Sequence, residues 1–118
     1  MSLLDDIAAA IRAGNYESGP HIGTRAQKRR IAPEYIEQGI GNDAPEIIEP
    51  YPDDARGPSC LIRGELLSGD VIHVCVGYSQ LRDSAVAMDE ASVFLMTCYW
   101  PDPAQWDPAF RVRRAKKR

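Results

Sequence analysis

The first apolar pattern along the chain has the period of an α-helix. Five apolar residues fall on one helical stripe, and Ser2 and Asp5 form the pattern of a capping box at its start. Gly14 follows the stripe, as glycine often does at a helix C-terminus. The sequence therefore predicts an amphipathic helix over residues 2–14, followed by an irregular break at 15–19.

Two further helices are predicted before the pattern changes. Residues 21–30 form a polar run that predicts a second helix. Pro33 then lies where proline is favoured, in a first helical turn, and Gly39 and Gly41 mark a helix end. The third helix is therefore short.

From residue 46 onward the pattern has the period of β-strands. The runs 46–51, 59–67, 71–78 and 92–100 are predicted strands, and Pro50 restricts the first of them to an edge or a strand end. A tight turn between the second and third runs predicts an antiparallel hairpin. Helices followed by strands indicate an α+β fold, in which N-terminal helices pack on one face of a four-stranded antiparallel meander.

Length and composition favour one domain. The chain has 118 residues, of which 44% are hydrophobic and 26% charged, and this suits a single domain with its own core. We divide it into an accessory helix at 1–14, a core at 15–113 and a basic tail at 114–118. The tail is expected to be solvated.

The chain is expected to be soluble and cytoplasmic, without membrane contact. No apolar run approaches the roughly 20 residues that a membrane helix needs, and the N-terminus carries acids where a signal peptide carries bases. Cys60, Cys75 and Cys98 lie in apolar runs without a CxxC pair. We therefore expect core thiols in a reducing compartment rather than disulfides or zinc ligands.

Charge is unevenly distributed along the chain, although the net charge is only −3. Four of the 14 basic residues lie in 25–30 and six in 111–118, whereas 34–54 holds seven acids and no base. This segregation predicts a local anion-binding face rather than a generally basic protein.

The most unusual polar feature is a stripe of His21, Arg25 and Arg29 in the predicted second helix. A step of four residues turns an α-helix by only about 40°, so the three side chains point the same way. Because like charges repel, an anion is expected opposite them: a phosphate, a nucleic acid, or carboxylates of the same fold.

Each central strand is predicted to have one apolar side and one side with chemically active groups. The apolar side of the last strand is expected to include Phe94 and Met96. If the polar sides coincide, one patch contains Arg63, Glu65, His73, Thr97 and Tyr99. The aromatic residues interpreted as packing residues, or as a lid over the sheet, are Tyr51, Trp100, Trp106 and Phe110.

Familiar cofactor and metal motifs are absent from the sequence. It has no GxxxxGK[ST] or GxGxxG phosphate loop, no HExxH, no paired CxxC and no GxSxG. Two histidines 52 residues apart, without clustered carboxylates, make a poor metal site. We therefore expect no cofactor and, for any catalysis, a mechanism without metal.

The order of several short motifs resembles the domain of unknown function 4258 family. That family has a His-x3-Arg-Met-x2-Arg-Gly-Ile helix, a Leu-His-Val-Val strand, and a closing Thr-x-Tyr-x-Pro-Asp strand followed by a Trp and an Arg. Over about residues 16–114 the matching positions are His21, Arg25, Arg29, Ile31, His73, Thr97, Tyr99, Pro101, Asp102, Trp106 and Arg113. Ala26 and Arg30 depart from the family's Met and Gly, so no glycine cap is expected after the second helix.

The resemblance implies a layout similar to the RelE- and BrnT-like toxin ribonucleases, which cleave RNA without metal when the 2′-hydroxyl attacks the neighbouring phosphate. This chemistry needs a base for the hydroxyl, an acid for the departing oxygen, and cations for the phosphate. On this hypothesis His73 or Glu65 is the base, and His21 is the acid. Tyr99 orients the phosphate. Phosphate or RNA contacts are assigned to Arg25, Arg29, Arg63, Thr97, Arg111 and Arg113.

Two other functions are consistent with the sequence. In one, the chain is a non-enzymatic protein-interaction module, and Arg25 and Arg29 pair with the acidic stretch 34–54 or with carboxylates of a protein partner, which is an antitoxin or a second copy. An acidic pI near 5.3 and the apolar first helix suit this role. In the other, the basic helix binds a nucleotide or small phosphate ligand without cleaving it.

Overall fold

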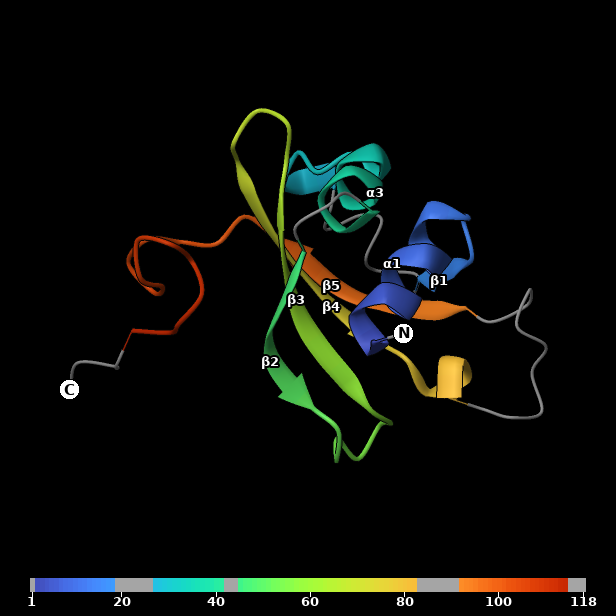
Figure 1. The fold of residues 1–118 in the computed structure, drawn as a ribbon. Helices are drawn as coiled ribbons and strands as arrows, with labels where there is room; N and C mark the ends of the chain where they lie inside the picture. The colour runs from blue at the N-terminus through green and yellow to red at the C-terminus, as the bar shows by residue number, and fades with distance from the viewer. Residues whose placement is uncertain (1, 19–26, 42–44, 83–91, 115–118) are drawn as a thin grey trace.

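Helices and strands form two layers, with α-helices on one face of a twisted β-sheet (Figure 1). The structure is a computed structural model, and it describes residues 2–18, 27–41, 45–82 and 92–114. Its elements are α1 (Leu3–Arg12), β1 (Tyr16–Ser18), α3 (Pro33–Gly41), β2 (Glu46–Tyr51), β3 (Ser59–Glu65), β4 (Val71–Gly77), the 3₁₀ helix η1 (Ser79–Arg82) and β5 (Val93–Tyr99). The predicted α+β class is confirmed. Within these residues no helix has the length and apolar character needed to cross a membrane.

The sheet has five strands in the order β1-β5-β4-β3-β2. Strands β2 to β5 form the predicted antiparallel meander, and β2 lies at an edge. The prediction of only four antiparallel strands is wrong, because β1 pairs in parallel with β5, from Tyr16 opposite Val93 to Ser18 opposite Leu95. Three residues are too few to show an alternating pattern. Gly14, with a φ of 77°, helps to turn the chain from α1 toward β5.

Helix α1 begins with the capping box that the sequence predicts. The Ser2 hydroxyl accepts from the Asp5 N–H at 3.1 Å, and the Asp5 carboxylate accepts from the Ser2 N–H at 3.3 Å. The apolar stripe buries Ile7 and Ile11 completely. Both side chains belong to the same core as the central strands, so α1 is part of the main hydrophobic layer.

Helix α3 approaches the sheet closely where two glycines face each other. A Cβ added at Gly64 in β3 would lie 2.6 Å from the carbonyl oxygen of Gly39 in α3. A Cβ added at Gly39 would lie 2.9 Å from Cγ2 of Ile72. The absence of both side chains therefore lets the helix backbone lie directly on the strand.

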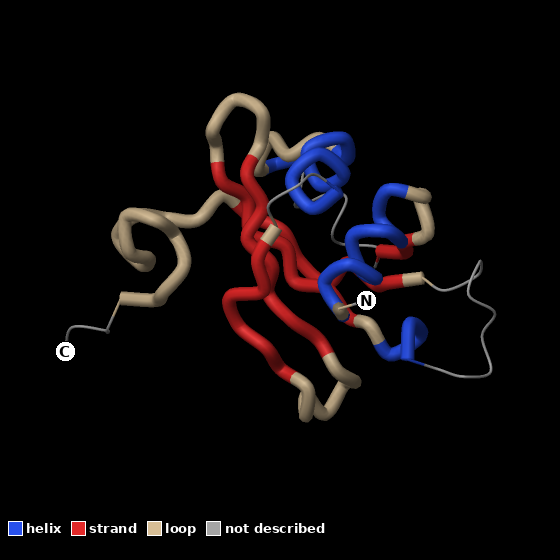
Figure 2. Tube along the Cα trace, viewed as in Figure 1, coloured by secondary structure: helices blue, strands red, loops and turns tan. Residues whose placement is uncertain are grey.

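The two faces of the sheet are covered by different parts of the chain. The core between helices and sheet includes Cys60, Ile62, Ile72, Val74, Val76, Leu95 and Cys98. We call the opposite side the helix-free face, because no described helix packs on it. Residues 101–114, the C-terminal segment, lie against part of that face and contain neither helix nor strand (Figure 2). Figure 1 shows this segment and the helices on opposite sides of the sheet.

Two β-bulges change which side chains reach the helix-free face. In β2, Ile47 lies opposite Ile62 and Glu49 lies opposite Leu61, so Ile48 is the extra residue. The second bulge is in β5.

In β5, Thr97 lies opposite Cys75 and Leu95 lies opposite Val76, so Met96 is the extra residue. Leu95 consequently enters the core, whereas Phe94 stays 44% exposed. The prediction that Phe94 and Met96 belong to the apolar core side is therefore wrong.

The turn that follows the predicted second helix keeps a left-handed residue although no glycine is present. Gln27 and Lys28 are helical, and residues 19–26 lie outside the described part of the chain. Arg30 has a φ of 57°, and its N–H donates to the Gln27 carbonyl at 3.1 Å. The conformation that suits the family's glycine is thus adopted by an arginine, at an energetic cost.

Candidate functional site on the helix-free face

Strand register brings three predicted site residues together in a row across the sheet. Arg63 of β3 lies opposite His73 of β4, which lies opposite Tyr99 of β5. Directly paired residues on one face of a sheet have their Cβ atoms about 5 Å apart. The polar sides of the central strands therefore coincide at these three residues, which is the condition that the sequence pattern alone left open.

His73 is fully buried at the centre of this row. Its Nε2 lies 2.8 Å from the carbonyl oxygen of Phe110, which can only accept, so Nε2 carries the proton. The lone pair of Nδ1 then faces the Tyr99 hydroxyl at 3.3 Å. Burial lowers the pKa of His73 and outweighs the opposing effect of the bond to Phe110, so the ring is neutral at physiological pH.

The Trp106 side chain packs on the buried imidazole of His73 and shields it from solvent. Its ring meets the His73 ring edge-on, with centroids 4.4 Å apart, and only 1% of the residue is exposed. Tyr99 contacts His73 in the same edge-on manner at 5.3 Å. The interpretation of Trp106 as a packing residue over the sheet is confirmed.

Arg63 is the second buried polar residue of the row, with 7% of its surface exposed. Its Nε donates to the Ala109 carbonyl at 2.8 Å. Its Nη1 lies 3.8 Å from the Glu65 carboxylate and 4.0 Å from that of Glu46. Arg63 therefore joins the C-terminal segment to β3 and neutralises two acids at the edge of the face.

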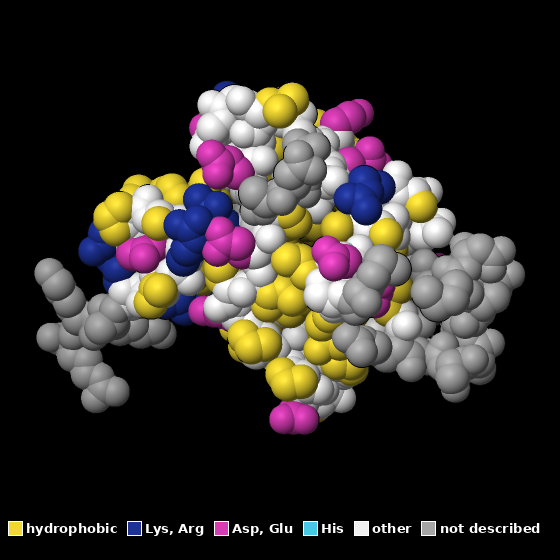
Figure 3. All heavy atoms as spheres, in the orientation of Figure 1, with side chains coloured by type: hydrophobic (Ala, Val, Ile, Leu, Met, Phe, Trp, Pro, Cys, Tyr) yellow, Lys and Arg dark blue, Asp and Glu magenta, His cyan; other side chains and the backbone are white. Residues whose placement is uncertain are grey.

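Two arginines of the C-terminal segment form forked ion pairs with β2. Arg111 donates from Nε and Nη2 to Glu46, with the shortest distance 2.7 Å. Arg113 donates from Nε and Nη2 to Glu49 at 2.7 and 3.0 Å, and its guanidinium lies 4.6 Å from the Trp106 ring centre. Figure 3 shows basic and acidic side chains next to each other where this segment meets the sheet.

Glu49 and Tyr51 belong to the site, but no role was assigned to Glu49 from the sequence, and the interpretation of Tyr51 as a packing residue is wrong because 40% of its surface is exposed. The Tyr51 hydroxyl donates to Glu49 Oε1, beside the Arg113 fork. Burial alone would raise the pKa of Glu49, but hydrogen bonds from Arg113 and Tyr51 outweigh it and hold that pKa below its usual value. The pKa of Tyr51 is raised by its bond to Glu49. Simple alternation places Glu49 on the opposite side from Glu46, and the bulge at Ile48 reverses this.

The remaining predicted residues of the sheet lie around this centre. Thr97 is half-buried opposite Cys75, and Glu65 is exposed at the end of β3. Burial raises the pKa of Tyr99, so its hydroxyl is protonated at neutral pH. Within the described ranges, no three histidine, cysteine or acidic side chains are grouped as a metal site needs.

The basic stripe is only partly within the described chain. His21 and Arg25 lie outside the described residues. Arg29 donates from Nη1 to the Cys98 carbonyl at 2.5 Å, and its own carbonyl accepts from the Trp100 indole at 2.7 Å. Arg29 therefore anchors its turn to the end of β5. In the acidic stretch, Glu46 and Glu49 pair with C-terminal arginines.

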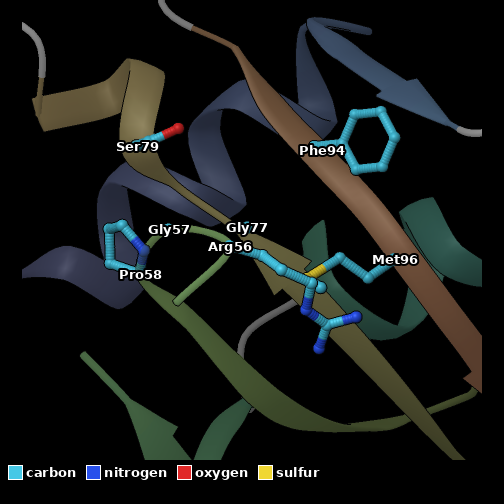
Figure 4. Close-up of a pocket in the computed structure, with 7 residues that line it drawn as sticks. All are labelled: Arg56, Gly57, Pro58, Gly77, Ser79, Phe94 and Met96. Carbon is cyan, nitrogen blue, oxygen red and sulfur yellow. The ribbon is translucent and has the colours of Figure 1, made fainter. Parts of the chain in front are cut away.

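A shallow hollow of about 340 Å³ lies farther along the helix-free face (Figure 4). Its lining residues are Arg56, Gly57, Pro58, Gly77, Ser79, Phe94 and Met96. Gly77 lies opposite Phe94, and 44% of Phe94 is exposed. Arg56 at the edge of this hollow pairs with Asp54 at 3.3 Å.

Comparison with known proteins identifies a family. A family model described as domain of unknown function (DUF4258) matches residues 19–100. No curated protein and no solved structure matches the chain. The matched region contains His73 and Tyr99 and ends before the C-terminal segment, which supplies the cover of the site.

Proposed function

Since the chain belongs to the DUF4258 family, whose function is unknown, we propose from the helix-free face that it binds RNA and cleaves it without a metal ion. The observation that carries this proposal is the convergence of four motif residues. His73 contacts Tyr99 and Trp106, and Arg113 lies over Trp106. A titratable ring, a phenol and a guanidinium thus lie within one cluster, as acid–base work on a phosphodiester requires.

Arginines at the rim of this cluster supply the phosphate contacts in the proposal. Arg111 and Arg113 are each about half exposed, and each uses two N–H groups on a carboxylate. A guanidinium has five N–H donors, so a phosphate can be bound beside the carboxylate or in its place. Arg63 holds the C-terminal segment at this rim through its bond to the Ala109 carbonyl. Thr97 and Tyr99 contact the phosphate from β5, and Tyr99 orients it.

The roles of acid and base follow the family-based hypothesis. His21 is kept as the acid and Arg25 as a phosphate ligand, although both lie outside the described residues. Arg29 supports the site through its bond to β5. The base is assigned to His73 or Glu65, and of the two only Glu65 is open to solvent.

The test is an RNA cleavage assay with EDTA present. Single-stranded RNA of mixed sequence should be cut to products with 2′,3′-cyclic phosphate ends, detected by mass spectrometry. The variant Arg113→Ala should lose about 10- to 100-fold in rate, since it removes a charge from the phosphate site. Arg12→Ala is the matched control, because Arg12 bonds the Gly41 carbonyl in the helical layer. If the folded protein neither binds nor cleaves RNA, the proposal is wrong.

A second candidate function, a protein-interaction module, is favoured by the charge pairing on the same face. Arg63, Arg111 and Arg113 all have carbonyl or carboxylate partners within the chain. Such internal pairing reduces the field available to attract RNA. Self-association measured by analytical ultracentrifugation, or a salt-sensitive complex with an antitoxin-like partner, together with absent RNA binding, would favour this function.

A further inference from the structure

Glu49 reaches the helix-free face only because of the bulge in β2. Its partner Leu61 pairs in turn with Cys75, on the same side of the sheet as Arg63 and His73. Unlike His73, which is fully buried, the Glu49 side chain keeps 20% of its surface exposed. A substrate at the rim can therefore touch Glu49 while the C-terminal segment stays in place.

The contacts of Glu49 leave its carboxylate able to accept a further hydrogen bond. Its Oε1 accepts from Tyr51 and from Arg113 Nη2, while Oε2 accepts from Arg113 Nε among the described residues. A carboxylate offers about four acceptor positions on its two oxygens. Besides burial, the negative charge of Glu49 helps to raise the pKa of Tyr99, so the two groups interact electrostatically.

His73 is poorly placed for the same task. Its Nε2 proton is used by the Phe110 carbonyl, and its Nδ1 lone pair faces the Tyr99 hydroxyl. Reaching a ribose would require Trp106 and the segment around Phe110 to leave the sheet. The imidazole is better suited to fix the Tyr99 phenol in position, with its tautomer set by the bond to Phe110.

We infer that Glu49, in place of His73 or Glu65, is the base that contacts the RNA 2′-hydroxyl, and that His73 is a positioning residue for Tyr99. This inference rests on the proposed function. In the step, the 2′-oxygen gives its proton to Glu49 and forms a bond to phosphorus, and the bond from phosphorus to the 5′-oxygen breaks. The departing 5′-oxygen takes a proton from the general acid of the proposed function, and that acid and Glu49 then exchange protons with solvent, which restores both. Arg113 stabilises the charge on the phosphate.

The experiment compares Glu49→Gln with Glu46→Gln. Both residues lie on β2, face the same side and bind one arginine of the C-terminal segment, so the pair separates base chemistry from loss of an ion pair. Glu49→Gln should lower the single-turnover cleavage rate by about 100-fold or more, with RNA affinity retained, since positioned bases contribute about 10²- to 10⁴-fold. Glu46→Gln should stay within about threefold of wild type.

Further variants keep the result interpretable. Glu49→Asp retains the charge and the arginine pairing but withdraws the carboxylate by one methylene, so it should fold and still lose about tenfold or more in rate. His73→Gln should reduce the rate less than Glu49→Gln when both are compared as folded proteins. Undiminished cleavage by folded Glu49→Gln or Glu49→Asp overturns this inference alone, whereas absence of cleavage by wild type overturns both it and the proposed function.

Discussion

Phe110 presents its carbonyl oxygen to His73 Nε2 at 2.8 Å from a left-handed backbone conformation, with a φ of 58°. A non-glycine residue adopts this conformation at a cost, so the surrounding contacts must hold it in place. Ala109, the preceding residue, accepts from Arg63. Two buried polar side chains of the sheet thus fix one short stretch of the C-terminal segment.

The buried imidazole should make stability depend on pH below neutrality. Burial lowers the pKa of His73 from 6.5, so the unfolded chain takes up this proton at a higher pH than the folded chain. The free energy of unfolding should therefore fall as the pH drops below about 6.5. Urea denaturation from pH 7.5 to 5 measures this loss of stability. The part of the loss that is due to His73 should be absent in His73→Gln.

The contribution of the carboxylates to stability is lost at a lower pH than that of His73. Arg111 holds the pKa of Glu46 below 4.5, and bonds to the backbone N–H of Arg111 hold that of Asp107 below 3.8. Their stabilisation is present at neutral pH and is lost only on further acidification. An unchanged pH dependence in His73→Gln between pH 7.5 and 5 would contradict the assignment to His73.

Replacing Arg30 by glycine should stabilise the protein. Arg30 has a φ of 57°, where an L-residue is less stable than glycine by about 1–2 kcal/mol, and the greater freedom of unfolded glycine offsets part of this gain. We expect a net increase of about 0.5–1 kcal/mol in the free energy of unfolding. Arg30→Ala, which keeps the Cβ, should give no such gain when both are measured by urea denaturation.

Adding a methyl group at Gly64 should be strongly destabilising. Its Cβ would lie 2.6 Å from a backbone atom of Gly39, which cannot rotate away as a side chain can. We expect a loss of about 3 kcal/mol, at the upper end for overpacking. Gly77→Ala is the control in the neighbouring strand, because its Cβ would meet neighbours at 3.7 Å or more. Thermal unfolding should show little change for Gly77→Ala, and equal melting temperatures would be inconsistent with this account.

Removing the Trp106 ring should release the C-terminal segment. Trp106 is 1% exposed and contacts both His73 and Arg113, so Trp106→Ala should cost about 3–5 kcal/mol. Trypsin should then cut faster after Arg111 and Arg113. Val112→Ala, at a position 63% exposed in the same segment, should behave like wild type in both assays. Slow cleavage in Trp106→Ala would show that the segment is held by other contacts.

Much of the fold follows from periodic patterns, and the exceptions have local causes. The capping box at Ser2, the short helix from Pro33 and the four antiparallel strands were all predictable. Strand β1 was not, because three residues carry too little pattern to distinguish a strand from a break. The exposure of Phe94 was missed because a bulge at Met96 reverses the alternation, and alternation alone cannot locate a bulge.

The candidate site was predictable to the extent that it depends on strand alternation. The row of Arg63, His73 and Tyr99 follows from register in the central strands. Glu49 was missed for the same reason as Phe94, since the bulge at Ile48 changes its side. The complete burial of His73 depends on the C-terminal segment, whose path has no periodic signal.

The pairing of β1 with β5 has a consequence for how the molecule forms. Tyr16 of β1 pairs with Val93 of β5, so β1 leaves the ribosome well before its partner strand has been synthesised. Contacts between residues so distant in sequence carry a large loop-closure cost and tend to form late in folding. We therefore expect the β2–β4 hairpins to form before the N-terminal strand docks, so that β1 closes the sheet in one of the last steps.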